Sequence, residues 1–224
     1  MNKITGKKPM KLLHPTPTII VLNGPIDSGK DAIGEEIKNL VGPDCHLAAF
    51  KEPLYDYMKS IYNITQVQID EWSQKGDEDP AKWQKHLPRP ELEGLNFREA
   101  LIHVSEDLIK PVYGDDIMGV QLGIKLRQMW PRPKLIVITD GGFDSELLGL
   151  KSTVHPHYKV IVVKLYREGC EYGPNDSRSY FSPELLKTHK IHCYDLYNDK
   201  TIRNAARNIL WYEWRLSDDP ARKE

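Results

Sequence analysis

The sequence has little cysteine and no long apolar run. Its three cysteines are an odd number, and none forms a Cys-x-x-Cys pair. This argues against a disulfide framework and a structural zinc site, and favours a reducing cytosol. No apolar stretch approaches the ~20 residues of a membrane span, and the lysine-containing N-terminal segment lacks the apolar core of a secretory signal. We therefore expect a cytoplasmic protein with no membrane partner.

The sequence also lacks an excess of charge of either sign. Lysine and arginine total 31 against 32 aspartates and glutamates, which gives a formal net charge of -1. Such a balance provides no overall field to attract a nucleic acid polymer or an anionic membrane, although a local cationic pocket remains compatible with it. The eight histidines show no spacing typical of a metal site.

Apolar runs and helical periodicity alternate along the chain. Buried strands are predicted at residues 18–22, 135–140 and 160–165, with shorter strands at 46–50 and 190–194. Helices are predicted at residues 30–41, 53–62, 97–109, 115–129 and 201–216. This alternation predicts a three-layer α/β fold with a parallel sheet, whose strand C-termini meet at one edge, where ligands bind.

Four segments define the predicted domain organisation. Residues 1–17 are interpreted as a mobile N-terminal tail, and residues 18–224 as a single domain. Residues 73–96 are polar and proline-containing, which indicates an insertion or a mobile loop. Residues 168–182 form a polar, glycine-containing loop after the third buried strand, which suggests a short lid.

The strongest motif is a glycine-rich loop between the first strand and the first helix, Gly24-Pro25-Ile26-Asp27-Ser28-Gly29-Lys30. Backbone N–H groups of such a loop point inward and cradle phosphate oxygens, while the helix N-terminus adds partial positive charge. Lys30 is expected to contact the β and γ phosphates of ATP. The spacing Gly-x-x-x-x-Gly-Lys therefore predicts a P-loop phosphotransferase.

Two aspartates are candidate ligands for Mg²⁺. Asp31 stands where a P-loop usually has serine or threonine, and its carboxylate either holds Mg²⁺ or only caps the helix. Asp140 ends a buried strand, where an aspartate either holds the metal or forms a turn. For Asp140 we favour the metal role.

Positive side chains are expected to neutralise charge on the migrating phosphoryl group. Arg167 and Arg178 bracket the predicted lid and are assigned a catalytic role, as are Lys30 and Asp140. Lys51, after the second strand, and Arg98, at the start of a helix, are assigned to acceptor binding.

An ordered set of fragments resembles the bacteriophage deoxynucleoside monophosphate kinases. The fragments are Gly24 with Ser28-Gly29-Lys30-Asp31, Phe50-Lys51-Glu52-Pro53-Leu54, Phe97-Arg98-Glu99-Ala100-Leu101, Gly114-Asp115-Asp116-Ile117, Thr139-Asp140-Gly141-Gly142-Phe143 with Glu146, Arg167, Asp176-Ser177-Arg178-Ser179 and Asn198-Asp199-Lys200-Thr201. The resemblance implies a P-loop kinase fold with a helical acceptor-binding region and a short lid. It also implies ATP and Mg²⁺, a nucleoside monophosphate substrate and, for a phage-encoded chain, the host cell cytoplasm.

Two positions depart from that family's pattern and keep other functions open. Gly142 stands where the family usually has arginine, and Met118 where an aromatic is common. We expect Gly142→Arg to be tolerated if the backbone there has a negative φ. One alternative is a P-loop kinase for another small phosphorylated acceptor, and another is a degenerate kinase that binds a nucleotide or a partner. The sequence leaves open the base accepted and whether the chain forms a homodimer.

Overall fold

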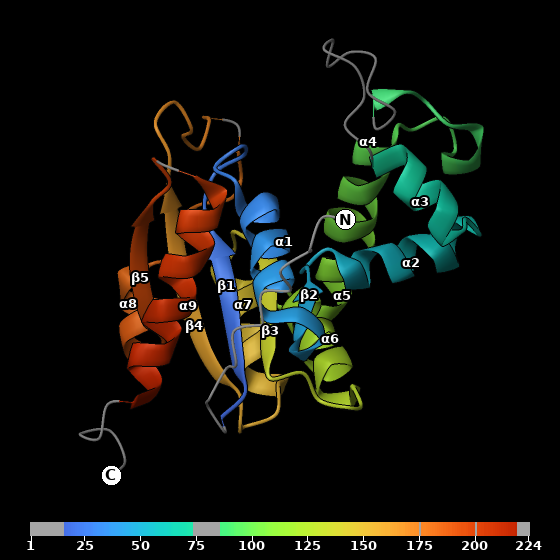
Figure 1. Ribbon diagram of the computed structural model, residues 1–224. Coiled ribbons are helices and arrows are strands. Elements are labelled where there is room, and N and C mark those ends of the chain that lie inside the picture. The colour runs from blue at the N-terminus through green and yellow to red at the C-terminus, as the bar shows by residue number, and fades with distance from the viewer. Residues whose placement is uncertain (1–15, 74–85, 175, 200, 219–224) are drawn as a thin grey trace, which may run out of the picture. The chain divides into compact units, whose positions relative to one another are not determined.

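The computed structural model describes residues 16–73, 86–174, 176–199 and 201–218. Within them, five strands form one parallel sheet in the order β2-β3-β1-β4-β5 (Figure 1). The strands are β1 (Thr18–Asn23), β2 (Cys45–Ala48), β3 (Leu135–Gly141), β4 (Lys159–Tyr166) and β5 (His192–Tyr197). The predicted parallel sheet is confirmed.

The central strand β1 is buried on both faces. Its six residues are at most 1% exposed, and successive side chains point to opposite faces of the sheet. On one face, α1 (Lys30–Val41) packs against α9 (Ile202–Asp218), and both cover the sheet. Figure 1 shows α8 (Pro183–Thr188) behind the sheet from these two helices. The arrangement confirms the predicted three-layer α/β class.

The core beneath α1 and α9 explains why these sequences form these elements. Apolar side chains of all five strands meet helical residues spaced three or four apart. The fully or nearly fully buried members are Ile20, Leu22, Ile33, Ile37, Leu135, Val137, Val163, Leu165, Ala206, Ile209 and Leu210. This packing fixes where β1 ends and α1 begins, and so positions the glycine loop between them.

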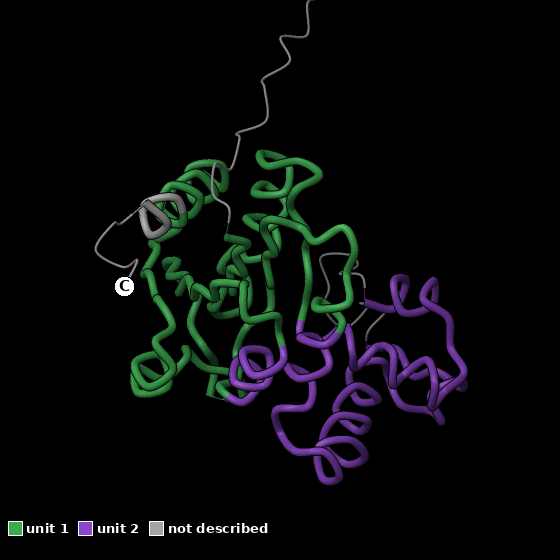
Figure 2. The backbone as a smooth tube through the Cα atoms, turned by 90° about the horizontal axis from the view of Figure 1, so that it is seen from below, with its two compact units in different colours: residues 1–49, 125–144, 154–224 green, residues 50–124, 145–153 purple. Residues whose placement is uncertain are grey.

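The chain divides into two compact units (Figure 2). The first contains the sheet and comprises residues 1–49, 125–144 and 154–224, and the second comprises residues 50–124 and 145–153. The glycine loop, Asp140, Arg167 and Arg178 all belong to the first unit.

The second unit is helical and has a core of its own. Its elements include α2 (Glu52–Tyr62), α3 (Gln66–Ser73), the short 3₁₀ helix η4 (Pro90–Leu92), α4 (Phe97–Ile102), the π-helix η5 (His103–Ile109) and α5 (Lys110–Tyr113), with most of α6 (Ile117–Gln128) and α7 (Asp144–Thr153). Trp72, Leu92 and Phe97 are at most 3% exposed in this core. A capping box begins α4, because Asn96 Oδ1 accepts from the Glu99 N–H while Glu99 Oε2 accepts from the Asn96 N–H, each at 2.9 Å.

The structure refines several sequence predictions. The helix predicted at residues 97–109 is α4 followed by a π-helix, and β3 continues one residue beyond Asp140. Leu92 of the predicted polar insertion is fully buried, so residues 86–96 contribute to the core of the second unit. Residues 74–85 of that insertion, and residues 1–15 of the predicted tail, lie outside the described residues. In the part of the chain that the structure describes, no helix has the length and hydropathy needed to span a membrane.

Candidate functional site: the glycine loop and its charged neighbours

At two positions in the loop between β1 and α1, the backbone leaves room for glycine only. A Cβ on Gly24 would lie 2.9 Å from the Leu165 carbonyl oxygen and from Ser28 Oγ. Gly29 has a φ of 97°, and a Cβ at this position would lie 2.7 Å from Asn198 Nδ2. Asp27 also takes a left-handed conformation, with a φ of 62°. The chain is therefore tightly curled here.

The residues of this loop hold one another in place. The Pro25 carbonyl accepts from Ser28 Oγ at 2.9 Å and from the Ser28 N–H at 3.4 Å. Gly29 is the N-cap of α1, and no side chain caps this helix. The first turn of α1 therefore directs its amides and its partial positive charge toward the loop, which suits an anion.

Lys30 reaches back over the loop from the first position of α1. Its Nζ donates to the carbonyls of Gly24 and Pro25, each at 2.5 Å. Burial, followed by the positive charge of Arg178, lowers the pKa of Lys30 to about 8, against the opposing effects of Asp31, Asp140 and Asp176. The structure therefore brings Asp31, Asp140 and Arg178, three of the predicted site residues, within electrostatic reach of Lys30. Their assigned roles stay predictions.

Arg178 is held by a neighbour that sequence reasoning did not assign. Its Nε donates to Asp176 Oδ1 at 2.9 Å and its Nη2 to Asp176 Oδ2 at 2.8 Å. These bonds to Asp176 raise the pKa of Arg178, so the guanidinium stays charged. A guanidinium binds phosphate oxygens through the same kind of paired hydrogen bonds that Arg178 makes to the carboxylate of Asp176.

Gly142 packs directly beneath Arg178. A Cβ at position 142 would lie 2.8 Å from Arg178 Cγ and 2.9 Å from its Cβ and Cδ. The stem of Arg178 thus occupies the space that a side chain at 142 would need. A larger side chain at 142 would force Arg178 or the backbone to shift, so these distances argue against the expectation that Gly142→Arg is tolerated.

Arg167 lies at the other end of the predicted lid and contacts the loop. It follows β4, and its exposed guanidinium donates from Nη1 to the Asp27 carbonyl at 3.0 Å. Its predicted catalytic role stays a prediction, but the structure does place it against the glycine loop.

The described part of the predicted lid is tied to the sheet edge at its C-terminal end. Phe181 is 1% exposed, Tyr180 donates from its hydroxyl to the Leu165 carbonyl at 2.8 Å, and the Ser179 N–H donates to the Gly142 carbonyl at 3.0 Å. The predicted closure of residues 168–182 stays a prediction.

Two buried asparagines brace the site, and sequence reasoning did not assign either of them to it. Asn198 donates from Nδ2 to the Ser28 carbonyl at 2.9 Å, which links the segment after β5 to the glycine loop. Asn23, the last residue of β1, is completely buried and bonds to both β3 and the lid segment. In the sequence, Asn23 ends a strand that leads to the site, and Asn198 directly follows another strand that does so.

Lys51 and Arg98 belong to the second unit. Lys51 is the N-cap residue of α2 and Arg98 lies in the first turn of α4, and both are exposed. Their assignment to acceptor binding stays a prediction.

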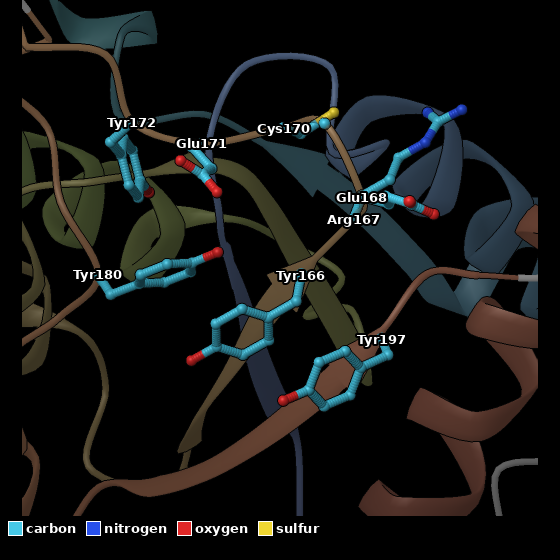
Figure 3. A pocket seen from close by; sticks show the side chains of 9 residues that line it. Tyr166, Arg167, Glu168, Cys170, Glu171, Tyr172, Tyr180 and Tyr197 are labelled. Atoms are coloured by element: carbon cyan, nitrogen blue, oxygen red, sulfur yellow. The ribbon is translucent and has the colours of Figure 1, made fainter.

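A pocket of about 570 Å³ lies beside the end of β4 (Figure 3). Tyrosines 166, 172, 180 and 197 line it together with Arg167–Glu171. Tyr166 packs against Tyr180 and Tyr197 with ring centroids 4.8 and 5.2 Å apart. Arg167 therefore borders both this aromatic pocket and the glycine loop.

The acidic side chains of the site suit a magnesium ion whose other ligands include phosphate oxygens. Among the described residues, no group of three or more His, Cys, Asp or Glu side chains could hold a metal ion alone. Mg²⁺ in phosphotransferases commonly takes one or two carboxylates and completes its shell with phosphates and water. Asp31 and Asp140, both within reach of Lys30, fit that requirement.

The fold and the loop together place the chain in the P-loop class of α/β proteins. Two solved structures are similar to it in fold. A shikimate kinase from Acinetobacter baumannii in complex with shikimate is 16% identical with a TM-score of 0.44, over 90% of this chain and 95% of that one. A gluconokinase from Sinorhizobium meliloti 1021 is 15% identical with a TM-score of 0.39, over 90% and 94%.

No protein-family model matches the sequence, and no curated protein matches it. The resemblance to bacteriophage deoxynucleoside monophosphate kinases therefore stays a prediction from the sequence fragments.

Proposed function

We propose that this chain is an ATP-dependent kinase that transfers a phosphoryl group to a small acceptor. The supporting observation is the convergence of a glycine loop, the N-terminus of α1 and two cationic side chains. Gly24 and Gly29 let the backbone curl, and Lys30 lies on the loop within electrostatic reach of Arg178. Such an arrangement concentrates positive charge where a chain of phosphates would lie.

Each residue of the site has a role in this proposal. Loop amides between Gly24 and Lys30 bind phosphate oxygens, and Lys30 exchanges its carbonyl partners for the β and γ phosphates. Arg178 neutralises charge that develops on the migrating group. Asp31 and Asp140 hold Mg²⁺, which neutralises phosphate oxygens when it is bound.

The proposed reaction needs positioning more than acid–base chemistry. An acceptor oxygen forms a bond to the γ phosphorus of ATP, and the bond from that phosphorus to the β–γ bridging oxygen breaks. ADP leaves with the electron pair. A phosphate acceptor is already ionised, so no strong general base is required, and charge neutralisation by the chain provides the rate gain.

We further propose a deoxynucleoside monophosphate as the acceptor. The support is the order of the sequence fragments that resemble the bacteriophage kinases, including Phe50–Leu54 and Phe97–Leu101, which carry Lys51 and Arg98. In this proposal those two residues bind the acceptor's phosphate.

A coupled assay that detects ADP tests both levels of the proposal. The panel contains the deoxynucleoside and ribonucleoside monophosphates and non-nucleotide acceptors such as shikimate. We expect turnover with at least one deoxynucleoside monophosphate, and a folded Lys30→Ala protein that loses ~10²–10³-fold or more. Lys38→Ala, at an exposed position of the same helix, is the matched control and should keep its activity.

The outcomes separate the alternatives. Turnover only with a non-nucleotide acceptor would retain the kinase and replace its substrate. Nucleotide binding without turnover on any acceptor would indicate the degenerate module. Near-wild-type turnover in Lys30→Ala would overturn the mechanism.

A further inference from the structure

Asn23 is a completely buried polar side chain that connects three parts of the site. Its Nδ2 donates to the Gly141 carbonyl at 3.1 Å, to the Ser179 carbonyl at 3.0 Å and to the Tyr172 hydroxyl at 3.2 Å. Its Oδ1 accepts from the Phe181 N–H at 2.9 Å. The two N–H groups of this amide are shared among three acceptors and its oxygen accepts one bond, with all four partners in β3 or in the loop after β4.

The partners of Asn23 surround Arg178 in the sequence. Ser179 follows Arg178 directly, and Phe181 lies two residues further. The Ser179 N–H also donates to the Gly142 carbonyl at 3.0 Å, so the backbone beside Arg178 is bonded to both β1 and the residue after β3. With Gly142 beneath its stem and Asp176 on its guanidinium, Arg178 has little freedom to move from the site.

Asn23 also lies directly before Gly24, the first residue of the phosphate loop. A shift of Asn23 would change the relation between the loop and Arg178, because its backbone leads directly into the loop while its side chain bonds to the segment that carries Arg178. Asn23 is also within one residue of Asp140 across the sheet, since Asn23 pairs with Gly141 in the parallel register. The side chain thus stands where the loop, the acidic strand end and the arginine-bearing segment meet.

We propose that Asn23 is a positioning residue that fixes Arg178 against the phosphate loop. It touches no reacting atom in this role and acts through Arg178. The inference rests on the proposed function, because its effect is on phosphoryl transfer. A positioned guanidinium contributes more than a mobile one, since a displacement of about 1 Å can cost ~10²-fold in rate.

The test is a double-mutant cycle with Asn23→Ala and Arg178→Ala. In the wild-type background, Asn23→Ala should lower kcat roughly 10- to 100-fold while the KM for ATP changes less than about threefold. In the Arg178→Ala background, the same change should lower kcat less than about threefold, because the group it positions is gone. Asn39→Ala, at an exposed position of α1, is the control and should leave kcat unchanged.

A purely structural role would give a different pattern. Loss of packing alone would lower the melting temperature and would add fully to the effect of Arg178→Ala. Asn23→Ser, which keeps one hydroxyl for this network, replaces Asn23→Ala if the latter does not fold. Amide exchange gives a second readout, since the Phe181 N–H should exchange faster without the Asn23 oxygen.

The outcomes distinguish failure of the role of Asn23 from failure of the proposed function. An active wild-type enzyme with unchanged kcat in the folded Asn23 variant overturns the role of Asn23 alone, as do additive effects. A wild-type chain inactive with every acceptor overturns the proposed function and the role of Asn23 with it. Non-additive loss of kcat with faster exchange at Phe181 supports the inference.

Discussion

Lys30 experiences opposing effects, and their balance determines how it responds to an anion. Burial and Arg178 disfavour its positive charge, whereas Asp31, Asp140 and Asp176 favour it, and the pKa falls to about 8. A phosphate group placed between Lys30 and Arg178 would relieve the repulsion between the two cations and raise the pKa of Lys30 again. Nucleotide binding and protonation of Lys30 are therefore coupled.

This coupling predicts that nucleotide affinity falls as the pH rises. Below a pH of about 8 the lysine is charged without nucleotide, and above it binding must also take up a proton, so the affinity for ADP should fall by up to about tenfold per pH unit. Calorimetry from about pH 6 to about pH 10 measures this, and Lys30→Arg should remove the break, because arginine stays charged throughout. An affinity that is flat in this range would show that Lys30 does not bind the phosphates.

Asp140 is predicted to hold Mg²⁺ rather than only to shape the end of β3. Asp140→Asn keeps the side-chain size but removes the negative charge, so the Mg²⁺ concentration for half-maximal activity should rise roughly tenfold or more. The control is Asp44→Asn, whose carboxylate pairs with Lys134 at 2.9 Å on the surface. An unchanged Mg²⁺ titration in Asp140→Asn would leave Asp140 without a metal role.

For single residues, a role can be predicted from the sequence where it depends on residues close by in the chain. The glycine loop and Lys30 could be assigned because seven consecutive positions carry the signal. Asn23 could not, since its partners Gly141, Tyr172 and Ser179 lie 118, 149 and 156 residues away. The hydrogen bonds that define its role exist only after the sheet has formed.

At the scale of elements, long apolar runs were reliable and short or irregular elements were not. The buried strands β1, β3 and β4 are confirmed, because continuous β-branched residues suit a sheet covered on both faces. The helices α3, α7 and α8, of eight, ten and six residues, were missed, as was the four-residue α5. The π-helix was also missed, because residues 97–109 were predicted as one regular helix.

The close packing of Gly142 against Arg178 predicts that even a methyl group impairs the site. Gly142→Ala would bring a Cβ to 2.8 Å from Arg178 Cγ, so Arg178 or the backbone must shift. We expect kcat to fall roughly tenfold with a smaller change in KM, and the loss to disappear in the Arg178→Ala background. Gly173→Ala is the control, because a Cβ there meets no heavy atom within 4 Å. Full activity in Gly142→Ala would show that this contact is irrelevant to transfer.

The segment after β4 is predicted to act on the transition state through its two arginines. Arg167→Ala and Arg178→Ala should each lower kcat more than they raise the KM for the acceptor, which indicates contacts made mainly in the transition state. The loss should be larger for Arg178, which is partly buried beside Lys30, than for exposed Arg167, which bonds to the Asp27 carbonyl. Steady-state kinetics with the best acceptor measure both, and exposed Arg207→Ala is the control. Unchanged kcat in both variants would make this segment an ordinary surface connection.

For the whole molecule, the nearly balanced charge makes the local site responsible for nucleotide binding. A net charge of -1 gives no general attraction for an anion, so the cations at the glycine loop must provide it. The two compact units have separate cores, and the glycine loop, Asp140, Arg167 and Arg178 all belong to the first. Nucleotide binding should therefore stabilise the fold of that unit directly.

Thermal unfolding tests this consequence in the full chain. At 100 times its Kd, ADP with Mg²⁺ should stabilise the folded state by about 2.7 kcal/mol, which raises Tm by roughly 5–10 °C for a chain of this size. Lys30→Ala should unfold at nearly the wild-type temperature without ADP, because Lys30 lies outside both apolar cores, yet show little or no shift at the same ADP concentration. Lys38→Ala should shift like the wild type. Equal shifts in Lys30→Ala and the wild type would mean that ADP binds elsewhere, because every contact proposed for its phosphates lies within reach of Lys30.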